Sequence, residues 1–370
     1  MCIRDRIKKV QADVPVMRAL REDKTRLQAG FLALDPRNGE VRAWVGSRAF
    51  SKDQFDHVQQ ARRQPGSTFK PFTYGAAFAQ GMSPNDTFMD GDVEIVIDGG
   101  NVWRPTDAGG PSYTNMTLRD GLAYSRNTIT AQLVNKVGAA SVAKFAWALG
   151  VRQSRLEEVP SLALGTSPVT LKEMVTAYST IANGGSYFEP FLVTSVEDRH
   201  GKVLERFKAK APQVAIERLT ADVLLDVMRG VIERGTGTAI RSRFGISADV
   251  AGKTGTTSDN TDSWFILMHS QMVAGAWVGF NDNRVTMQDS WGQGARAALP
   301  IVGETFQKAF AQKVIDPKLR FAAPVIAPPP PPPPPEPEIS NMPFGGGIPG
   351  VPIPAAGGTA MPEPAPMYGN

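Results

Sequence analysis

The stretch Gln64-Pro-Gly-Ser-Thr-Phe-Lys-Pro-Phe72 decides how this sequence of 370 residues is interpreted. Its proline–glycine pair is typical of a turn, and the apolar run at 72–78 predicts a helix. Residues three apart share a helix face, so the Lys70 amine is expected beside the Ser67 oxygen. At the start of a helix, unpaired backbone N–H groups also favour developing negative charge. The stretch therefore indicates a serine nucleophile with a lysine as its base.

A serine followed three residues later by a lysine is a weak signal when it stands alone. Ser141 and Lys144 have the same spacing, but the residues around them predict an ordinary helix that ends at Gly150. The pair at Ser67 and Lys70 therefore needs further motifs before it can be assigned a function.

Two such motifs follow in the chain, Ser125-Arg126-Asn127 and Lys253-Thr254-Gly255. Ser-x-x-Lys, Ser-x-Asn and Lys-Thr-Gly, in this order, are the signature of serine β-lactamases and penicillin-binding proteins. Ser-x-Asn occurs elsewhere in the chain, whereas Lys-Thr-Gly occurs once. The ordered set of three motifs is a strong signal.

From about residue 30 to residue 310 the sequence resembles the transpeptidase domain of a class A (bifunctional) penicillin-binding protein. The resemblance extends beyond the three motifs to the segments 32–41, 60–67, 160–165, 183–185 and 277–280. It implies an α+β fold of the serine β-lactamase/transpeptidase type, in which an antiparallel sheet has helices on both faces.

The resemblance also implies an activity. It is that of a serine-type peptidoglycan D,D-transpeptidase, which forms an acyl-enzyme at Ser67 from a stem peptide ending in D-Ala-D-Ala and passes the acyl group to an amine. β-Lactams are expected to acylate the same serine. Neither a metal nor an organic cofactor is expected.

The resemblance assigns roles to the residues at the matching positions. Ser67 is the nucleophile, Lys70 its base, Ser125 a proton relay to the leaving nitrogen, and Asn127 a support for Lys70 and the substrate amide. An unperturbed lysine is protonated near neutral pH, so we expect burial and the ammonium group of Lys253 to lower the pKa of Lys70.

The strand around Lys253 is expected to bind the substrate. The hydroxyls of Thr254 and Thr256 would hold its terminal carboxylate, with Lys253 adding positive charge, and Thr257 extends this binding strand. Gly255 would let the substrate backbone approach closely. The backbone N–H groups of Ser67 and Thr256 resemble the oxyanion hole of the family.

Composition excludes several other classes of protein. The formal net charge is +4, from 40 basic and 36 acidic residues that are spread along the chain, which gives no reason to expect nucleic-acid binding. Cys2 is the sole cysteine, so neither an internal disulfide nor a zinc–cysteine site is available. His57, His200 and His269 are scattered, which argues against a metal centre and a Ser-His-Asp triad.

The order of predicted elements supports the α+β fold. The segments 30–34 and 40–45 around a turn predict a hairpin, and 67–187 is mostly helical with loops near 90–111. Thr117 with Asp120, and Thr170 with Glu173, have capping-box spacing. Further along, the sequence predicts a hairpin at 192–196 and 203–207, a helix from Thr220 to about 234, strands at 253–257, 263–269 and 272–280, and a helix at 298–311.

Three regions are expected along the chain: a residual linker at 1–27, the transpeptidase domain at 28–322, and a proline- and glycine-rich tail at 323–370. Residues 1–6 resemble translated adaptor sequence, which indicates a 5′-truncated gene. The resembled family carries an N-terminal membrane anchor and a glycosyltransferase domain, and acts outside the cytoplasmic membrane. The sequence has neither a signal peptide nor an apolar span, so an anchor is expected only in a missing N-terminal region.

Eight consecutive prolines at 328–335 predict an extended spacer within a flexible tail. A docking site for cell-wall synthesis partners is the functional alternative for this tail.

Three alternatives to transpeptidation remain open from the sequence. Water as the acceptor would make the protein a D,D-carboxypeptidase. A β-lactamase would need a base that activates water, and Glu157, Glu158 and Glu173 lie in the general region without a motif that selects one. A non-catalytic β-lactam-binding module is the third alternative, against which the intact motifs argue.

Overall fold

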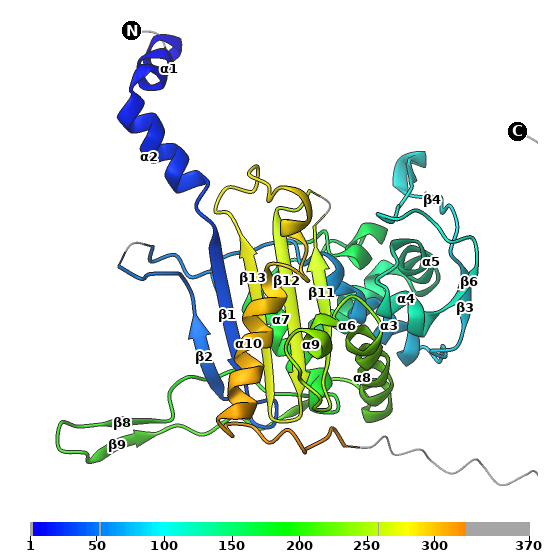
Figure 1. Cartoon of the computed structure of the whole chain (residues 1–370). Coiled ribbons are helices and arrows are strands. Elements are labelled where there is room, and N and C mark those ends of the chain that lie inside the picture. The colour runs from blue at the N-terminus through cyan, green and yellow to red at the C-terminus, as the bar shows by residue number, and fades with distance from the viewer. Residues whose placement is uncertain (1–2, 52, 258, 323–370) are drawn as a thin grey trace, which may run out of the picture. The chain divides into compact units, whose positions relative to one another are not determined.

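The protein folds around a five-stranded antiparallel sheet with the strand order β11-β12-β13-β1-β2 (Figure 1). The computed structural model describes residues 3–51, 53–257 and 259–322. The strands of this sheet are β1 (Gln28–Leu34), β2 (Val41–Val45), β11 (Ala251–Thr256), β12 (Asp262–His269) and β13 (Met272–Gly279). β1 pairs with β13 on one side and with β2 on the other, so the sheet joins strands from the start and the end of the described chain. The predicted α+β class is confirmed.

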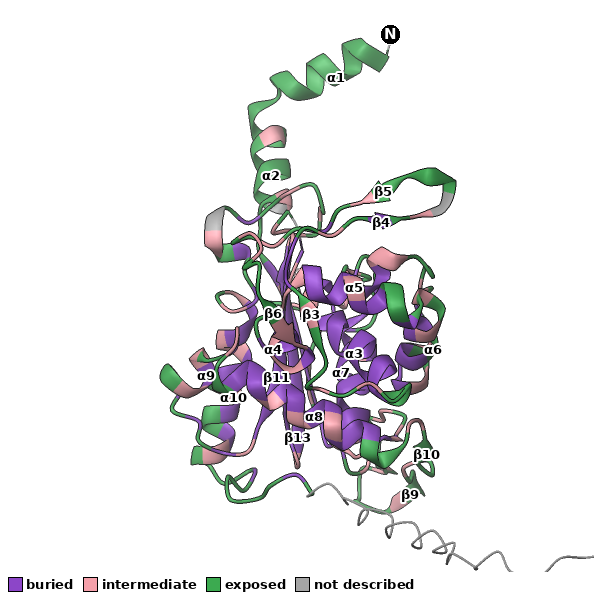
Figure 2. Cartoon of the chain, turned by 90° about the vertical axis from the view of Figure 1, so that its right-hand side faces the viewer, coloured by how far each residue is buried: buried purple, intermediate pink, exposed green. Residues whose placement is uncertain are grey.

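Each face of the sheet is covered by helices. Side chains along a strand point alternately to the two faces, and each face packs into its own hydrophobic cluster. In β1, Leu32 and Leu34 pack into the first cluster, while Phe31 and Ala33 pack into the second. The second cluster is completed by α10 (Ala298–Ala311), which has the predicted bounds. Burial on both faces explains why β12 and β13 consist entirely of buried residues (Figure 2).

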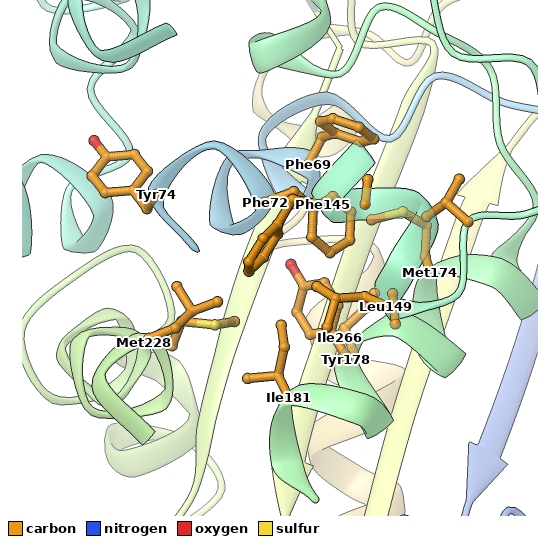
Figure 3. Close-up of a cluster of buried hydrophobic side chains, with 14 of the residues drawn as sticks. Phe69, Phe72, Tyr74, Phe145, Leu149, Met174, Tyr178, Ile181, Met228 and Ile266 are labelled. Atoms are coloured by element: carbon orange, nitrogen blue, oxygen red, sulfur yellow. The ribbon is translucent and has the colours of Figure 1, made fainter. Parts of the chain in front are cut away.

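The first cluster lies between the sheet and a group of helices from the middle of the chain. These helices are α3 (Lys70–Ala79), α4 (Leu118–Ala123), α5 (Asn127–Val137), α6 (Ala139–Leu149), α7 (Leu171–Ala182) and α8 (Arg218–Glu233), with the short turns η1 (Gly66–Phe69) and η3 (Pro160–Leu164). Figure 3 shows the aromatic and aliphatic side chains that meet there, among them Phe69, Phe72, Phe145, Tyr178 and Ile266.

The start of one of these helices was predicted correctly from its capping residues, and the start of another was not. The capping box at α7 is complete, since Thr170 and Glu173 each accept a hydrogen bond from the backbone N–H of the other. The expectation that Thr220 opens the next helix is wrong by two residues, because α8 begins at Arg218 with Glu217 in the capping position. Thr220 instead lies within the first turn and is buried.

The chain also forms short two-stranded sheets, separate from the five-stranded sheet. The segment between α3 and α4 contains β3 (Thr87–Met89), β4 (Ile95–Val96), β5 (Val102–Trp103) and β6 (Asn115–Thr117), with the turn η2 (Asp98–Gly100). After α7 come β7 (Ser186–Tyr187), the hairpin β8 (Ser195–Glu197) and β9 (Val203–Arg206), and β10 (Gln213–Val214). The predicted hairpin near residue 200 is therefore confirmed, with shorter strands.

The remaining elements are helical. They are α1 (Ile3–Ala12), α2 (Val14–Lys24), α9 (Ala239–Ser242) and η4 (Asp289–Gly292). Helix α1 buries none of its residues, and the assignment of 1–27 as a linker stays a prediction. Within the described ranges, no helix has the length and apolar character needed to cross a membrane. The proline-rich tail lies outside the described residues.

Candidate active site

Ser67 lies on the turn η1, directly before α3, and is partly exposed. Hydrogen bonds and the packing of a buried side chain fix the position of this turn. The Tyr178 hydroxyl of α7 donates to the Thr68 carbonyl at 2.6 Å, and the Thr68 hydroxyl donates to the Pro65 carbonyl at 2.6 Å. Phe69 is fully buried against Phe72. The hydroxyl of Ser67 is therefore presented on a rigid turn, as the proline–glycine pair predicted.

Strand β11, at the edge of the sheet, packs directly against this turn. A Cβ on Gly255 would lie 2.6 Å from the Pro65 carbonyl oxygen and 2.8 Å from the Thr68 Cγ2. Glycine is therefore required at 255 by the turn that carries Ser67. The expected reason, close approach of a substrate backbone, is not needed to explain this residue.

The same contact brings the Thr256 backbone to the turn. The Thr257 N–H bonds the Asp262 carbonyl at 3.2 Å, and hydrogen-bonded pairs alternate along an antiparallel ladder. The peptide groups of Thr256 therefore point away from β12, toward the free edge. Consistent with this, a Cβ on Gly66 would lie 2.5 Å from the Thr256 carbonyl oxygen. The two backbone segments of the predicted oxyanion hole thus lie side by side.

The Lys70 amine, which is fully buried, points toward the second motif. Its Nζ donates to the Asn127 Oδ1 at 2.7 Å, to the Ser125 Oγ at 3.3 Å, and to the Ser125 carbonyl. Among the described residues, Ser67 is not one of its hydrogen-bond partners. The spacing of three residues correctly places Lys70 on the turn of helix after Ser67, while the side chain itself is drawn to Ser125 and Asn127.

Lys253 reaches the same serine from β11. Its Nζ, also fully buried, donates to the Ser125 Oγ at 2.8 Å and to the Thr254 carbonyl at 3.0 Å. Ser125 has a positive φ of 60°, which turns its side chain between the two amines. Three motifs that are far apart in the sequence therefore converge on one hydroxyl.

Burial controls the protonation of both lysines. Removal from water lowers the pKa of Lys70 to about 7, with Arg126 acting in the same direction and Asp107 against it. Burial also lowers the pKa of Lys253 well below its usual value, and the neighbouring Lys70 lowers it further.

The lowered pKa of Lys70 is confirmed, with burial as its main cause and Arg126 adding to it. The two amines also lie close enough to repel each other when both are charged, and this repulsion lowers the pKa of Lys253. Burial of the Lys253 amine works against its predicted role as a source of positive charge for a carboxylate.

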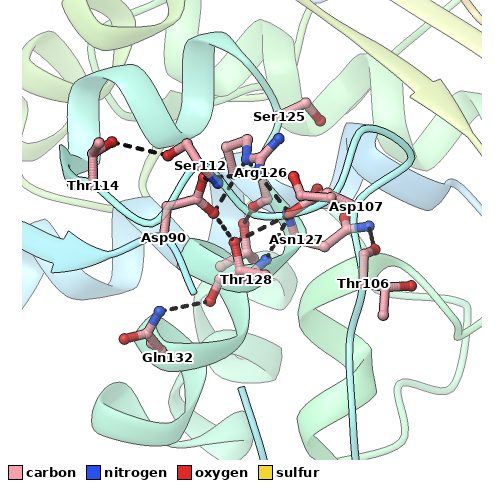
Figure 4. A network of polar contacts seen from close by, with 12 residues as sticks. Asp90, Thr106, Asp107, Ser112, Thr114, Ser125, Arg126, Asn127, Thr128 and Gln132 are labelled. Atoms are coloured by element: carbon pink, nitrogen blue, oxygen red, sulfur yellow. Dashed lines mark hydrogen bonds and ion pairs between the residues drawn. The ribbon is translucent and has the colours of Figure 1, made fainter. Parts of the chain in front are cut away.

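A polar network that sequence reasoning missed surrounds the start of α5 (Figure 4). The Asp107 Oδ1 accepts the Asn127 backbone N–H at 2.7 Å, and Arg126 pairs with Asp90 at 2.7 Å and with Asp107 at 3.5 Å. Thr128 donates from its hydroxyl to both aspartates. Arg126 sits inside the recognised Ser125–Asn127 motif, so its position offered a signal, whereas the two aspartates lie in loops with none.

The three threonines after Lys253 have different surroundings. The Thr254 hydroxyl bonds the Thr236 hydroxyl at 2.6 Å, and the Thr256 hydroxyl accepts the Gly294 backbone N–H at 3.0 Å. The Thr257 hydroxyl accepts the backbone N–H groups of Thr261 and Asp262 at 3.1 and 3.0 Å. The Thr257 side chain is buried and its hydroxyl is bonded within its own turn, and its part in substrate binding stays a prediction.

Other candidate groups are occupied elsewhere. His57 bonds the Gly46 carbonyl and Asn281, and His269 bonds the Leu319 carbonyl, as expected of structural histidines. No group of three potential metal ligands occurs in the described part of the chain. Glu173 accepts hydrogen bonds from Gln153, Ser154 and Thr170, so its carboxylate is a helix cap rather than a free base for water activation.

Comparison with known proteins agrees with this fold and site. A sequence model of the family described as "Penicillin binding protein transpeptidase domain" matches residues 29–285. Penicillin-binding protein 1A of Rickettsia conorii is 32% identical over 342 residues, covering 85% of this chain and 42% of that protein. Penicillin-binding protein 1A of Neisseria meningitidis is 34% identical over 284 residues, covering 74% and 35%.

Solved structures show the same fold. Penicillin-binding protein 1A of Haemophilus influenzae has a TM-score of 0.75 at 24% identity, over 81% of this chain and 49% of that one. PonA1 of Mycobacterium tuberculosis has a TM-score of 0.68 at 26% identity, over 82% and 84%. PonA1 has also been solved in complex with penicillin V, with a TM-score of 0.67 at 25% identity, over 85% and 87%.

An antiparallel sheet with helices on both faces is the fold that this chain shares with these penicillin-binding protein structures. The chain belongs to the family of penicillin-binding protein transpeptidase domains. The predicted class A type is confirmed by relatives that are penicillin-binding proteins 1A, of whose length the chain spans 42% and 35% in the two cases above.

Proposed function

We propose that the protein is a peptidoglycan D,D-transpeptidase that works through an acyl-enzyme on Ser67. The observation that carries the proposal is the convergence of Lys70 and Lys253 on the Ser125 hydroxyl, at 3.3 and 2.8 Å, beside the Ser67 turn. A hydroxyl that lies between two amines with lowered pKa can exchange protons with them near neutral pH. An isolated serine hydroxyl has no such partner.

Acylation follows from these positions. The Ser67 oxygen attacks the carbonyl carbon of the penultimate D-alanine, and neutral Lys70 takes the hydroxyl proton. To do so, the amine leaves the Ser125 carbonyl and swings back toward Ser67 on the same helical turn. The N–H groups of Ser67 and Thr256 then stabilise the oxyanion, a kind of contact worth about 3 kcal/mol per donor.

The leaving nitrogen needs a proton before D-alanine can depart. The Ser125 hydroxyl supplies it and is reprotonated from the lysines that bond it. The peptide C–N bond breaks, D-alanine leaves as the free amine, and Ser67 keeps the acyl group as an ester. Attack by an amine of a second stem peptide releases the serine and forms the cross-link.

The hydroxyls of Thr254 and Thr256 would bind the terminal carboxylate of the substrate. Their partners, Thr236 and the Gly294 N–H, lie on the same face of β11 and fix the direction of both hydroxyls. A β-lactam, which carries a comparable carboxylate beside a strained amide, would acylate Ser67 in the same way. The solved complex of PonA1 with penicillin V supports this extension by similarity.

Among the alternatives, rapid hydrolysis of penicillin is the least supported. It requires a free carboxylate or similar base near the ester, whereas Glu173 caps α7, and Glu157 and Glu158 are exposed. Carboxypeptidase activity differs only in the acceptor, and it accompanies transpeptidation whenever water reaches the acyl-enzyme. A non-catalytic module would bind penicillin without releasing D-alanine.

The test is to incubate the protein with a pentapeptide ending in D-Ala-D-Ala and an excess of an amine acceptor. We expect free D-alanine and an acceptor adduct, with both products absent for Ser67→Ala at equal melting temperature. D-alanine without the adduct would indicate a carboxypeptidase. Penicillin binding with neither product would favour the non-catalytic module.

The setting of the activity is proposed from the relatives. Acting on peptidoglycan requires a site outside the cytoplasmic membrane, so we place the domain at the extracytoplasmic face, or in the periplasm. A full-length parent would carry the anchor and a glycosyltransferase domain, in keeping with relatives much longer than this chain. Sequencing the DNA upstream of codon 1 tests this directly.

A further inference from the structure

Asp107 connects a long loop to the active site in a way that the three motifs do not require. It lies after β5, in the segment that joins α3 to α4, and only 8% of its side chain is exposed. Its carboxylate accepts the backbone N–H groups of Asn127 at 2.7 Å and Thr128 at 3.3 Å. Arg126 precedes these residues and makes no side-chain cap, so Asp107 caps helix α5 from 20 residues away.

The same loop fixes the side chain of Asn127. Its Nδ2 donates to the Thr106 carbonyl at 2.7 Å (Figure 4). This leaves the Oδ1 to face the Lys70 amine, also at 2.7 Å. Residues 106 and 107 thus hold both the backbone and the amide orientation of Asn127. An amide turned the other way would present N–H groups to the lysine, and the contact would be lost.

Asp107 is also the anionic member of the charged groups around Lys70. From β11 comes Lys253, and from the start of α5 comes Arg126, which is paired with Asp90. Asp107 bonds the start of α5 and lies 3.5 Å from the Arg126 guanidinium. Its charge therefore offsets that of Arg126 and favours the protonated form of Lys70.

We propose that Asp107 is a positioning residue of this site, which holds the Asn127 carbonyl oxygen against the Lys70 amine and offsets the positive charge of Arg126. It contacts neither Ser67 nor the reacting atoms, so it acts through Asn127 and Lys70. The inference rests on the proposed function in one respect only, namely that acylation depends on Lys70.

Two variants separate the two parts of this role. Asp107→Asn keeps one oxygen that can accept the Asn127 N–H but removes the charge. Asp107→Ala removes both the acceptor and the charge. As a matched control we choose Glu173→Gln, since Glu173 also accepts backbone N–H groups at a helix start but bonds Gln153, Ser154 and Thr170, outside the lysine cluster.

The first readout needs no substrate. Titration of the Lys70 amine, followed by NMR with ¹³C-labelled lysine and assigned with Lys70→Met, reports its protonation directly. We expect its midpoint to fall by ~0.5 unit or more in Asp107→Asn, because an anion that stabilises the ammonium has been removed. Glu173→Gln should leave the midpoint where it is in the wild type, even if its melting temperature falls.

The second readout is the rate of acylation by a fluorescent penicillin from pH 5 to 9.5. In Asp107→Asn the acidic limb should move to lower pH with the NMR midpoint. In Asp107→Ala the plateau should fall roughly ten- to hundredfold, because Asn127 is no longer held in place.

The proposal is overturned if the Lys70 midpoint in Asp107→Asn equals that of the wild type. It is also overturned if Asp107→Ala loses only thermal stability, as the control does, while its folded molecules acylate at the wild-type rate. Should penicillin fail to acylate even the wild type, the proposed function falls. The NMR midpoint still decides the role of Asp107 in that case.

Discussion

Burial is the main reason why the pKa of Lys70 is lowered. Its side chain is fully buried, and its pKa falls to about 7 against a usual value near 10.5. The amine is held by hydrogen bonds to Asn127 and Ser125, and it forms no ion pair within the described residues. A neutral amine is therefore accessible near neutral pH.

A pH dependence of acylation follows from this pKa. Below pH 7 the Lys70 amine is protonated and cannot accept the Ser67 proton, so the acylation rate should rise with pH and level off above about 8. Stopped-flow acylation with a chromogenic β-lactam measures the profile. Lys70→Arg, which stays protonated throughout, should be inactive at every pH. A rate that stays flat from pH 5 to 9 would contradict the assignment of Lys70 as base.

At the residue scale, sequence reasoning found the groups that local motifs mark and missed those that only the fold brings together. Lys70, Ser125, Asn127 and Lys253 meet at one place, as expected, and Ser67 lies on the turn directly before the helix that begins at Lys70. Asp90, Asp107 and Thr236 were invisible, because their partners lie many residues away and no spacing encodes the contact. Nor could the motif show that the Thr257 hydroxyl is already bonded within its own turn.

At the scale of elements, the site depends on the contact between the edge strand β11 and the turn η1. Gly255 is the point of closest approach, where the Pro65 carbonyl leaves no room for a side chain. The strands themselves could be predicted, because β12 and β13 contain apolar runs separated by a turn and the Lys-Thr-Gly motif marks β11. Their contact with a turn nearly 200 residues earlier could not, since it depends on the order of strands in the sheet.

Gly255→Ala tests this contact. The added methyl group would lie 2.6 Å from the Pro65 carbonyl oxygen, so the strand and the turn must move apart. We expect acylation by penicillin to slow by about tenfold to a hundredfold, because the Thr256 backbone no longer lies against the turn that carries Ser67. Gly109→Ala, whose methyl group would meet nothing within 4 Å, is the control. Equal acylation rates in the two variants would contradict the account.

At the scale of the whole molecule, the core closes with residues that follow the last helix. Phe321 is 6% exposed, and its backbone N–H bonds the Asp249 carboxylate at 3.1 Å. Arg229 of α8 lies over the Phe321 ring and pairs with the same aspartate. The predicted domain limit at residue 322 therefore falls directly after a residue that the core needs.

Truncation tests this limit. Removing residues 323–370 should leave the melting temperature and the penicillin acylation rate within error of the full chain, since the described core does not include them. Phe321→Ala should lower the melting temperature by several degrees, as expected for a cost of about 3 kcal/mol when a buried phenylalanine is removed. Thermal melts of both variants make the comparison. A truncation that melts as low as Phe321→Ala would place the limit elsewhere.

The central claim, that Ser67 is the acylated nucleophile of this transpeptidase domain, can be tested with one measurement. The protein is incubated with benzylpenicillin, and peptide mass spectrometry locates the adduct over several hours. The account predicts one penicilloyl group, on Ser67, that persists from minutes to hours and is absent from Ser67→Ala. An adduct on another residue, or a folded wild-type protein that forms none, would contradict it.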